Sequence, residues 1–234
     1  MTTIAVTFAL PAESSEFLAL LRDKSRADRN GISIVRGTIA DRSIEVLHTG
    51  VGENLCRQRI GVLLDNQQFD FLISAGFAGS LNDEVQVNDV LVAKNFSTVD
   101  LKHAQSLLSN MSINTVNMLT VPAMIDSSEE RQKMARKSGA SAVDMETEFI
   151  ARACAAHGIP LLALRVITDT PTQPFPAPAN VLFDIQQQRT DMATLAKFFL
   201  AHPSRVPGLI QFARRITRAR TILANALIDL MRNL

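Results

Sequence analysis

Cysteine and histidine are scarce in this chain of 234 residues, which has two cysteines and four histidines. Cys56 and Cys154 are far apart in the sequence, so we expect both to be reduced, buried and small apolar residues rather than a disulfide. The histidines are scattered along the chain, which argues against a zinc site. We therefore expect no metal and no cofactor.

The sequence also lacks the segments that place a protein across a membrane or in the secretory pathway. No apolar run approaches the ~18 residues that a spanning helix needs, and residues 1–17 lack the basic start and apolar stretch of a signal peptide. The net charge of +1 gives the whole protein no electrostatic attraction for nucleic acid. We expect a cytoplasmic protein with no nucleic-acid partner.

What the sequence does contain is an alternation of short apolar runs and helix-length segments, which predicts an α/β domain with a central, twisted, mixed sheet in a three-layer sandwich. Residues 97–120 fit either a helix plus a strand or a loop, and residues 171–178 form a proline-rich loop, beyond which the chain is expected to be helical. The predicted strands are Thr3–Phe8, Ile32–Ile39, Ile44–Thr49, Phe69–Ala75, Val90–Lys94 and Leu161–Thr168. The predicted helices cover residues 12–22, 53–64, 128–138 and 145–157.

Four polar or glycine-rich segments follow predicted strands, where ligands bind in open α/β sheets. They contain Glu13, the segment Gly76–Gly79 interpreted as a loop, Val143–Glu146 and Asp169. Each also has an ordinary structural interpretation: a helix start for Glu13, a tight turn for the glycines and a turn residue for Asp169. Taken singly, none of them establishes a function.

In combination, these segments resemble the nucleoside phosphorylase/nucleosidase superfamily. The resemblance runs from the N-terminus to about residue 170, and the segments follow one another in the same order as in the family. The most specific part is Val143-Asp144-Met145-Glu146, followed about twenty residues later by Arg165-Val166-Ile167-Thr168-Asp169. Within the superfamily the chain is similar to the 5′-methylthioadenosine/S-adenosylhomocysteine nucleosidases, and residues 202–210 resemble a stretch of the hopanoid-associated phosphorylases. The other segments that carry the resemblance are Ala9–Glu13, Thr49–Gly52, Ser74–Leu81, Val87–Val92 and Ala142–Thr147.

The resemblance implies a purine nucleosidase and a role for each of three carboxylates. Cleavage of a ribosyl C–N bond builds positive charge on the sugar and negative charge on the base, so Glu146 would grip the ribose hydroxyls. Asp169 would protonate or hydrogen-bond N7 of the purine, and Glu13 would orient or deprotonate the attacking water. The implied substrate-binding residues are Glu146, Met145, Asp144, Phe77, Ala78, Gly79 and Thr168.

The sequence departs from the phosphorylases where they bind phosphate. Ser74 stands where the family has an arginine and Phe77 where it has a serine, and phenylalanine offers a dianion neither a donor nor a charge. We therefore expect water to cleave an adenine-type nucleoside, releasing free base, with a hopanoid-linked adenosine as one candidate substrate. Two alternatives stay open: a phosphorylase with phosphate as co-substrate, and a non-catalytic nucleoside-binding protein, which Phe77 and the short segment 95–142 make plausible.

Residues 203–234 form a basic, amphipathic, helical extension of the catalytic domain at residues 1–202. The extension holds six arginines and one acidic residue, Asp229. The first hypothesis is a helix packed on the body or on another subunit, since the family analogy implies a homo-oligomer. The second is a helix on the inner membrane surface. Its apolar positions are Leu209, Ala213, Ile216, Leu223, Leu227 and Leu230.

Overall fold

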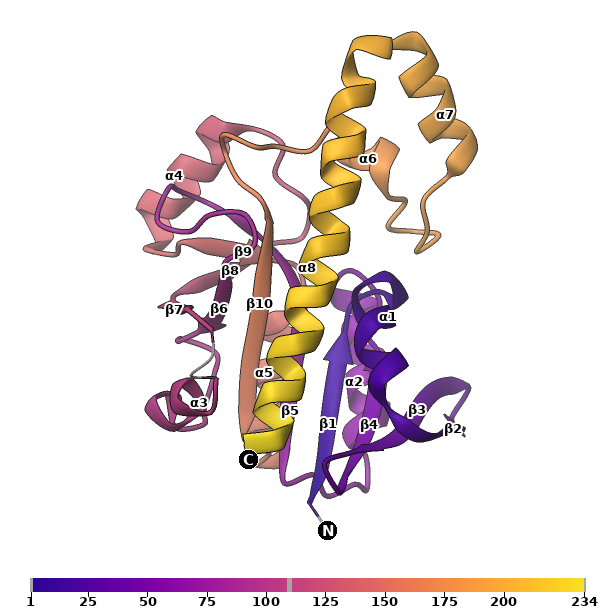
Figure 1. Cartoon of the computed structure of the whole chain (residues 1–234), viewed down its shortest axis with the longest axis vertical. Helices are drawn as coiled ribbons and strands as arrows, with labels where there is room; N and C mark the ends of the chain where they lie inside the picture. The colour runs from indigo at the N-terminus through magenta and orange to yellow at the C-terminus, as the bar shows by residue number, and fades with distance from the viewer. Residues whose placement is uncertain (1, 109–110, 234) are drawn as a thin grey trace.

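The computed structural model describes residues 2–108 and 111–233. Within these residues, ten strands form one mixed sheet, with helices against both of its faces (Figure 1). The strand order is β2-β3-β4-β1-β5-β10-β6-β7, and β9 pairs with both β5 and β8. This confirms the predicted three-layer α/β fold. The strands are β1 (Thr3–Phe8), β2 (Arg22–Arg29), β3 (Ile32–Ile39), β4 (Arg42–His48), β5 (Phe71–Ser80), β6 (Val90–Ala93), β7 (Ile113–Val116), β8 (Met118–Thr120), β9 (Ala142–Asp144) and β10 (Leu161–Asp169).

The alternation of side chains along β1 explains the two outer layers. Ile4 and Val6 enter one apolar cluster with residues of α1, α3 and α8, whereas Ala5 enters another with residues of α2 and α5. Successive strand residues point to opposite faces, so a strand that is buried on both faces needs helices on both sides. The helices are α1 (Pro11–Leu20), α2 (Glu53–Leu64), α3 (Leu101–Leu107), α4 (Ser128–Ser138), α5 (Thr147–His157), α6 (Ala179–Leu182), α7 (Met192–Ala201), the 3₁₀ turn η1 (Pro203–Arg205) and α8 (Val206–Asn233).

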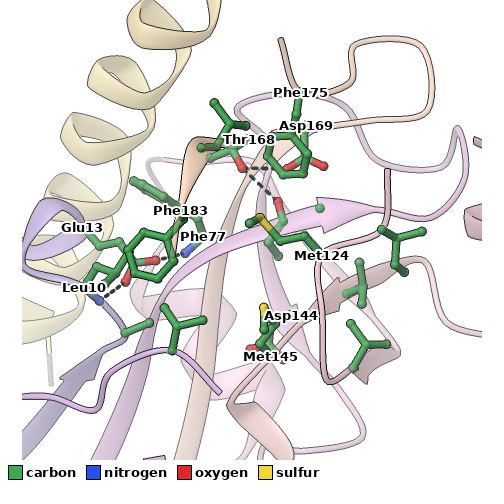
Figure 2. Close-up of a pocket in the computed structure, with 18 of the residues that line it drawn as sticks. Leu10, Glu13, Phe77, Met124, Asp144, Met145, Thr168, Asp169, Phe175 and Phe183 are labelled. Atoms are coloured by element: carbon green, nitrogen blue, oxygen red, sulfur yellow. Dashed lines mark hydrogen bonds between the residues drawn. The ribbon is translucent and has the colours of Figure 1, made fainter. Parts of the chain in front are cut away.

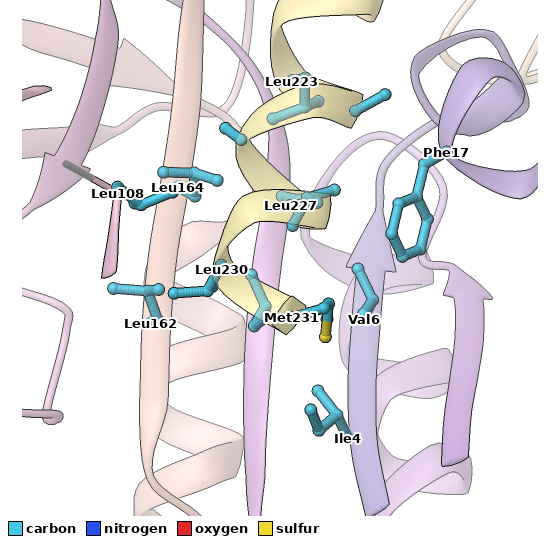
Figure 3. Close-up of a cluster of buried hydrophobic side chains, with 14 of the residues drawn as sticks. Ile4, Val6, Phe17, Leu108, Leu162, Leu164, Leu223, Leu227, Leu230 and Met231 are labelled. Carbon is cyan, nitrogen blue, oxygen red and sulfur yellow. The ribbon is translucent and has the colours of Figure 1, made fainter. Parts of the chain in front are cut away.

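Helix α8 runs along the sheet with its second half in the core (Figure 3). Leu223, Leu227 and Leu230 are buried in one cluster with Val6 of β1 and Leu164 of β10. The hypothesis that the extension packs on the body is therefore confirmed for this half. The membrane hypothesis is wrong for these three leucines, because the sheet already covers them.

The first half of α8 leaves the sheet and lies beside α6 and α7, which project beyond the carboxyl ends of β1 and β10 (Figure 1). Its residues from Val206 to Arg218 are exposed or half-buried. Among residues 2–108 and 111–233, none of the helices combines the length and apolar character that crossing a bilayer requires.

Several expected boundaries need correction. The predicted helix 12–22 ends at Leu20, and the following residues form β2, whose polar, mostly exposed sequence pairs with β3 and carries no apolar pattern. The helix expected from residue 145 begins at Thr147. Residues 97–120 contain a helix and two short strands, one strand more than the alternative of a helix plus a strand, and residues 109–110 lie outside the described residues. The expected helical C-terminal part is interrupted between α6 and α7.

The Gly76–Gly79 segment is the correction with the most consequence. It was expected to be a loop, but β5 continues through it to Ser80. The segment pairs with β10 on one side, and at Gly79 with Val143 of β9 on the other. The glycines therefore serve a purpose other than a turn.

Candidate active site

A cavity of about 280 Å³ lies where the parallel strands β1, β5 and β10 end (Figure 2). The three strands are adjacent in the sheet, so residues that follow or end them meet at one edge. Glu13, Glu146 and Asp169, the three carboxylates predicted from the sequence, all line this cavity. Their convergence is a property of the topology rather than of their spacing in the chain.

Glu13 is held by two backbone amides. It lies in the first turn of α1, where its Oε2 accepts a hydrogen bond from the Leu10 amide at 2.9 Å, as a capping residue does. Its Oε1 accepts from the Phe77 amide of β5, also at 2.9 Å. Burial raises the pKa of Glu13, against the lowering effect of these amides. The carboxyl group is thus fixed in place and holds its proton more tightly than an exposed glutamate.

The two glycines of β5 make room for two of the predicted site carboxylates. A Cβ on Gly76 would lie 3.1 Å from Glu13 Oε1, and a Cβ on Gly79 would lie 2.9 Å from Asp169 Oδ2. Both contacts are closer than ordinary van der Waals separation. Glycine at these positions lets two buried carboxylates approach the strand from different elements.

Glu146 lies between β9 and α5, immediately before the helix. Its Oε1 accepts a hydrogen bond from the Gly52 amide at 3.0 Å. Burial raises the pKa of Glu146 to about 8, and the nearby carboxylates of Asp144 and Glu13 add to the rise. No hydrogen bond within the described residues is recorded for its Oε2, which leaves that oxygen for a ligand in the cavity.

Asp169, at the end of β10, pairs with an arginine that the sequence analysis did not identify. The Arg131 guanidinium of α4 donates to Asp169 Oδ2 at 2.5 Å, and Thr168 Oγ1 donates to Oδ1 at 3.0 Å. Arg131 is 2% exposed and also donates to the carbonyl groups of Ile125 and Ser80. Burial raises the pKa of Asp169, while Arg131 lowers it. No sequence signal marks Arg131, because α4 is otherwise a polar surface helix.

Asp144 lines the cavity, but its carboxylate is engaged by the protein. Oδ2 accepts from Arg165 at 2.9 Å and from the Thr147 hydroxyl, and Oδ1 accepts from Thr120 Oγ1 at 2.9 Å. Arg165 also donates to Ser74. This buried network fixes the β9–α5 junction, and therefore Glu146, relative to β10.

The remaining predicted substrate-binding residues also line the cavity: Phe77, Ala78, Gly79, Met145 and Thr168. The chain after β10 contributes a further lining of the cavity, which is apolar. We call this apolar lining the roof. No sequence signal marks the roof, because its residues lie beyond about residue 170, where the segments that resemble the superfamily site end. It consists of Phe175, Leu182, Phe183, Phe212 and Ile216.

A second, much smaller cavity of about 10 Å³ adjoins Glu13. It is polar and is lined by Thr7, Ser74, Glu146 and Arg165 among others, and the buried Thr7 hydroxyl has no hydrogen-bond partner among the described groups. A polar space of this size holds about one water molecule. The described residues contain no group of three histidine, cysteine, aspartate or glutamate side chains arranged to hold a metal ion.

Comparison with known proteins agrees with this geometry. The family model described as "Phosphorylase superfamily" matches residues 3–109 and 100–201. The chain belongs to the phosphorylase superfamily. Among its relatives is a 5′-methylthioadenosine/S-adenosylhomocysteine nucleosidase of Bacillus pumilus, which is 21% identical over 216 residues. The alignment covers 77% of this chain and 90% of the relative.

Solved structures show the same fold over the whole chain. The Campylobacter jejuni 5′-methylthioadenosine/S-adenosylhomocysteine nucleosidase superposes with a TM-score of 0.76 at 17% identity, covering 100% of both chains. A mutant of Helicobacter pylori futalosine hydrolase superposes with a TM-score of 0.74, also at 17% identity and 100% of both chains. The fold of this phosphorylase-superfamily member therefore includes the α6–α8 region, which the family model matches only to residue 201.

Proposed function

We propose that this protein hydrolyses the N-glycosidic bond of an adenine-type purine nucleoside and releases the free base. The observation that carries the proposal is the position of Glu13, which borders both the large cavity and the water-sized polar cavity. A nucleoside in the first cavity and a water in the second would both contact the same carboxylate. The nucleosidases and the futalosine hydrolase among the related proteins are named for reactions of this kind.

Each carboxylate has a distinct part in the proposed reaction. Glu13, with its raised pKa, is suited to accept a proton from the attacking water. Glu146 has one oxygen on the Gly52 amide and the other available for ribose hydroxyls, whose hydrogen bonds strengthen as the sugar becomes cationic. Asp169 faces the departing base, and in its protonated form, which burial favours by raising its pKa, it donates a hydrogen bond or the proton itself to N7.

The two arginines that line the cavities are both ion-paired, which favours water over phosphate as the nucleophile. Arg131 is ion-paired with Asp169, and Arg165 is ion-paired with Asp144. A phosphate dianion needs free donors or uncompensated positive charge, and recruiting either arginine would leave a buried aspartate unpaired. Phe77, where the phosphorylases have a serine, adds no donor from its side chain.

The apolar roof supports a substrate with an apolar 5′-substituent. Phe175 and Phe212 pack edge to face with ring centroids 5.7 Å apart, and Phe183 lies at the same cavity. A wholly polar ribose end would leave these rings without an apolar partner. We propose a hopanoid-linked adenosine as the specific candidate substrate. We also propose that the enzyme is cytoplasmic and homo-oligomeric, and that it makes a peripheral contact with the inner membrane.

The test is a product assay with adenosine and 5′-alkyl adenosines, run with and without phosphate. Hydrolysis predicts adenine release in phosphate-free buffer, together with free ribose or its 5′-derivative. Formation of ribose 1-phosphate only when phosphate is present would identify a phosphorylase instead. Tight binding without turnover would identify a nucleoside-binding protein.

The variant Glu146→Gln supplies the control for this assay. The amide oxygen can still accept from the Gly52 amide, but the side chain can no longer ionise toward the sugar as it becomes cationic. We expect turnover to fall at least ~100-fold, the scale of one electrostatic contribution, with an unchanged fold by circular dichroism. Unchanged turnover would remove Glu146 from the mechanism.

A further inference from the structure

The part of the chain that projects beyond the sheet carries an unusual surface. We call α7, η1 and the first turns of α8, residues 192–210, the α7–α8 hairpin (Figure 1). Of the five large apolar side chains that are exposed in the described residues, four belong to it: Met192, Leu200, Val206 and Ile210. Single exposed apolar residues are ordinary, but their gathering on one projecting element marks an interaction surface.

Three of the exposed residues of α7 are apolar and lie along one side of the helix, whereas Thr194 and Lys197 are exposed beside them. Met192, Ala196 and Leu200 recur every four residues, and all are exposed, with Leu200 at 82% and Met192 at 68%. Such spacing aligns side chains along one side of a helix. The other side is occupied by Phe199, which is buried, and Phe198, which stacks on His202. The outer face of α7 is therefore apolar and has no partner among the described residues.

The hairpin itself carries charge of one sign, and the nearest acidic residue in the sequence is Asp191, the exposed N-cap of α7. The sequence from Met192 to Ile228 contains no acidic residue and six basic ones. Lys197, Arg205 and Arg214 are exposed, so they are free to meet an anionic surface. An isologous contact between two copies would bring the same basic surfaces together, and like charges across an interface are unfavourable.

We infer that the α7–α8 hairpin docks on an anionic lipid bilayer. Interfacial helices combine a short apolar face that enters the acyl boundary with basic residues that meet the headgroups, and this hairpin has both. The contact involves the hairpin and Arg214, one turn further along α8. It differs from the amphipathic helix expected over 203–234, since the second half of α8 lies in the core.

Docking through the hairpin would also place the pocket near lipid. Helix α8, which carries Val206 and Ile210 of the apolar face, continues into the roof through Phe212 and Ile216. A substrate with an apolar substituent in the bilayer would then reach the cavity from the side of the roof. The docking itself does not depend on the proposed hydrolysis, because it needs neither substrate nor turnover.

The experiment is flotation of the full-length protein with phosphatidylcholine vesicles, with or without phosphatidylglycerol, at low and high salt. We expect flotation with the anionic vesicles, weaker flotation with the neutral ones, and loss in high salt. The charge variant Lys197→Gln/Arg205→Gln/Arg214→Gln should bind anionic vesicles at least ~10-fold more weakly, because each basic residue near such a surface contributes to the affinity. A matched variant on α4, Lys133→Gln/Arg136→Gln/Lys137→Gln, removes the same charge elsewhere and should bind like the wild type.

The apolar face is tested by Met192→Gln/Leu200→Gln/Ile210→Gln against Leu20→Gln, which changes the other exposed large apolar residue of the described chain. All four positions are exposed, so these changes should leave the melting temperature unchanged. Only the hairpin variant should lose vesicle binding. No flotation of the wild type at low salt, or equal loss in the hairpin and control variants, would overturn the inference. So would a hairpin variant that changes only the sedimentation mass, since that result would place a second copy of the chain on this face.

Discussion

The pocket has two sides that differ in chemistry and in how the fold supports them. On the sheet side, Glu13, Glu146 and Asp169 are buried and held by backbone amides or by Arg131. On the roof side, aromatic and aliphatic residues from the loop after β10, α6 and the first half of α8 line the cavity without any such network. Helix α8 joins the two regions, because its second half lies in the core beneath the sheet side.

Under the proposed function, this contrast corresponds to a separation between the chemistry, on the sheet side, and substrate selection, on the roof side. Reacting groups need positions fixed to a fraction of an ångström, which the ends of three adjacent strands provide. Apolar recognition is non-directional, so a lining of helices outside the main sheet suffices for it. Changes on the sheet side should therefore affect stability and turnover, whereas changes on the roof side should affect the choice of substrate.

The largest expected effect is on the sheet side, at the pair of Asp169 and Arg131. Asp169→Asn leaves a buried guanidinium without its counter-charge, which should lower the free energy of unfolding by about 3–5 kcal/mol. Urea denaturation measures this loss. The double variant Asp169→Asn/Arg131→Met removes the unpaired charge and should recover part of it. If Asp169→Asn were as stable as the wild type, the ion pair would not be fixing this end of β10.

The two halves of α8 give the next largest difference. Leu227→Ala opens a cavity in the core, where Leu227 is fully buried, and should cost about 3 kcal/mol of unfolding free energy. Ile210→Ala changes a residue that is 49% exposed and should change stability by less than about 0.5 kcal/mol. Equal losses for the two variants in urea denaturation would mean that the first half of α8 is as integral to the core as the second.

The sequence could predict the sheet side better than the roof. Glu13, Glu146 and Asp169 were identified because they lie in segments that resemble a known family, and the apolar strands Thr3–Phe8 and Leu161–Thr168 because strands buried on both faces are continuous apolar runs. Strand β2 was missed because its exposed, polar residues carry no such pattern. The continuation of β5 was missed because glycines that make room for carboxylates look like glycines that make a turn.

Arg131 and the environment of α8 required three-dimensional information. Arg131 lies in a charged helix among residues of similar polarity, and only the fold shows that it is buried against Asp169. Both halves of α8 have basic and apolar residues at helical spacing. That pattern shows that a helix has an apolar face, but it does not show whether the sheet, a pocket or a lipid surface covers it.

A further prediction on the sheet side concerns pH. The pKa of Glu146 is raised to about 8 in the folded protein from an ordinary value near 4.5, so the folded state binds its proton more tightly than the unfolded state. Its contribution to stability is complete below pH 4.5 and is lost as the pH rises toward 8. Glu146→Gln cannot titrate, so its stability relative to the wild type should increase by about 3–4 kcal/mol between pH 5 and pH 8.

Urea denaturation of both proteins across this pH range measures that difference. Glu13 and Asp169, whose pKa values are also raised by burial, titrate in both proteins and largely cancel. A constant difference between the variant and the wild type would show that Glu146 titrates alike in the folded and unfolded states. The environment of Glu146 on the sheet side would then not disfavour its ionised form, contrary to our prediction.

The smallest expected effect lies on the roof, at Phe212. The ring is half-buried and packs against Phe175, so Phe212→Ala should leave the fold and the turnover of unsubstituted adenosine unchanged. For an adenosine with a long apolar 5′-substituent, KM should rise about tenfold, because the substituent loses a large part of the apolar surface that it would bury. Phe149→Ala is the matched control: Phe149 is also half-buried, but it lies on α5 outside the pocket, against Arg57. Steady-state kinetics on both substrates measures the difference. Equal losses of kcat/KM on the two substrates would mean that Phe212 acts in the chemistry of the sheet side and not in the selection of the substituent.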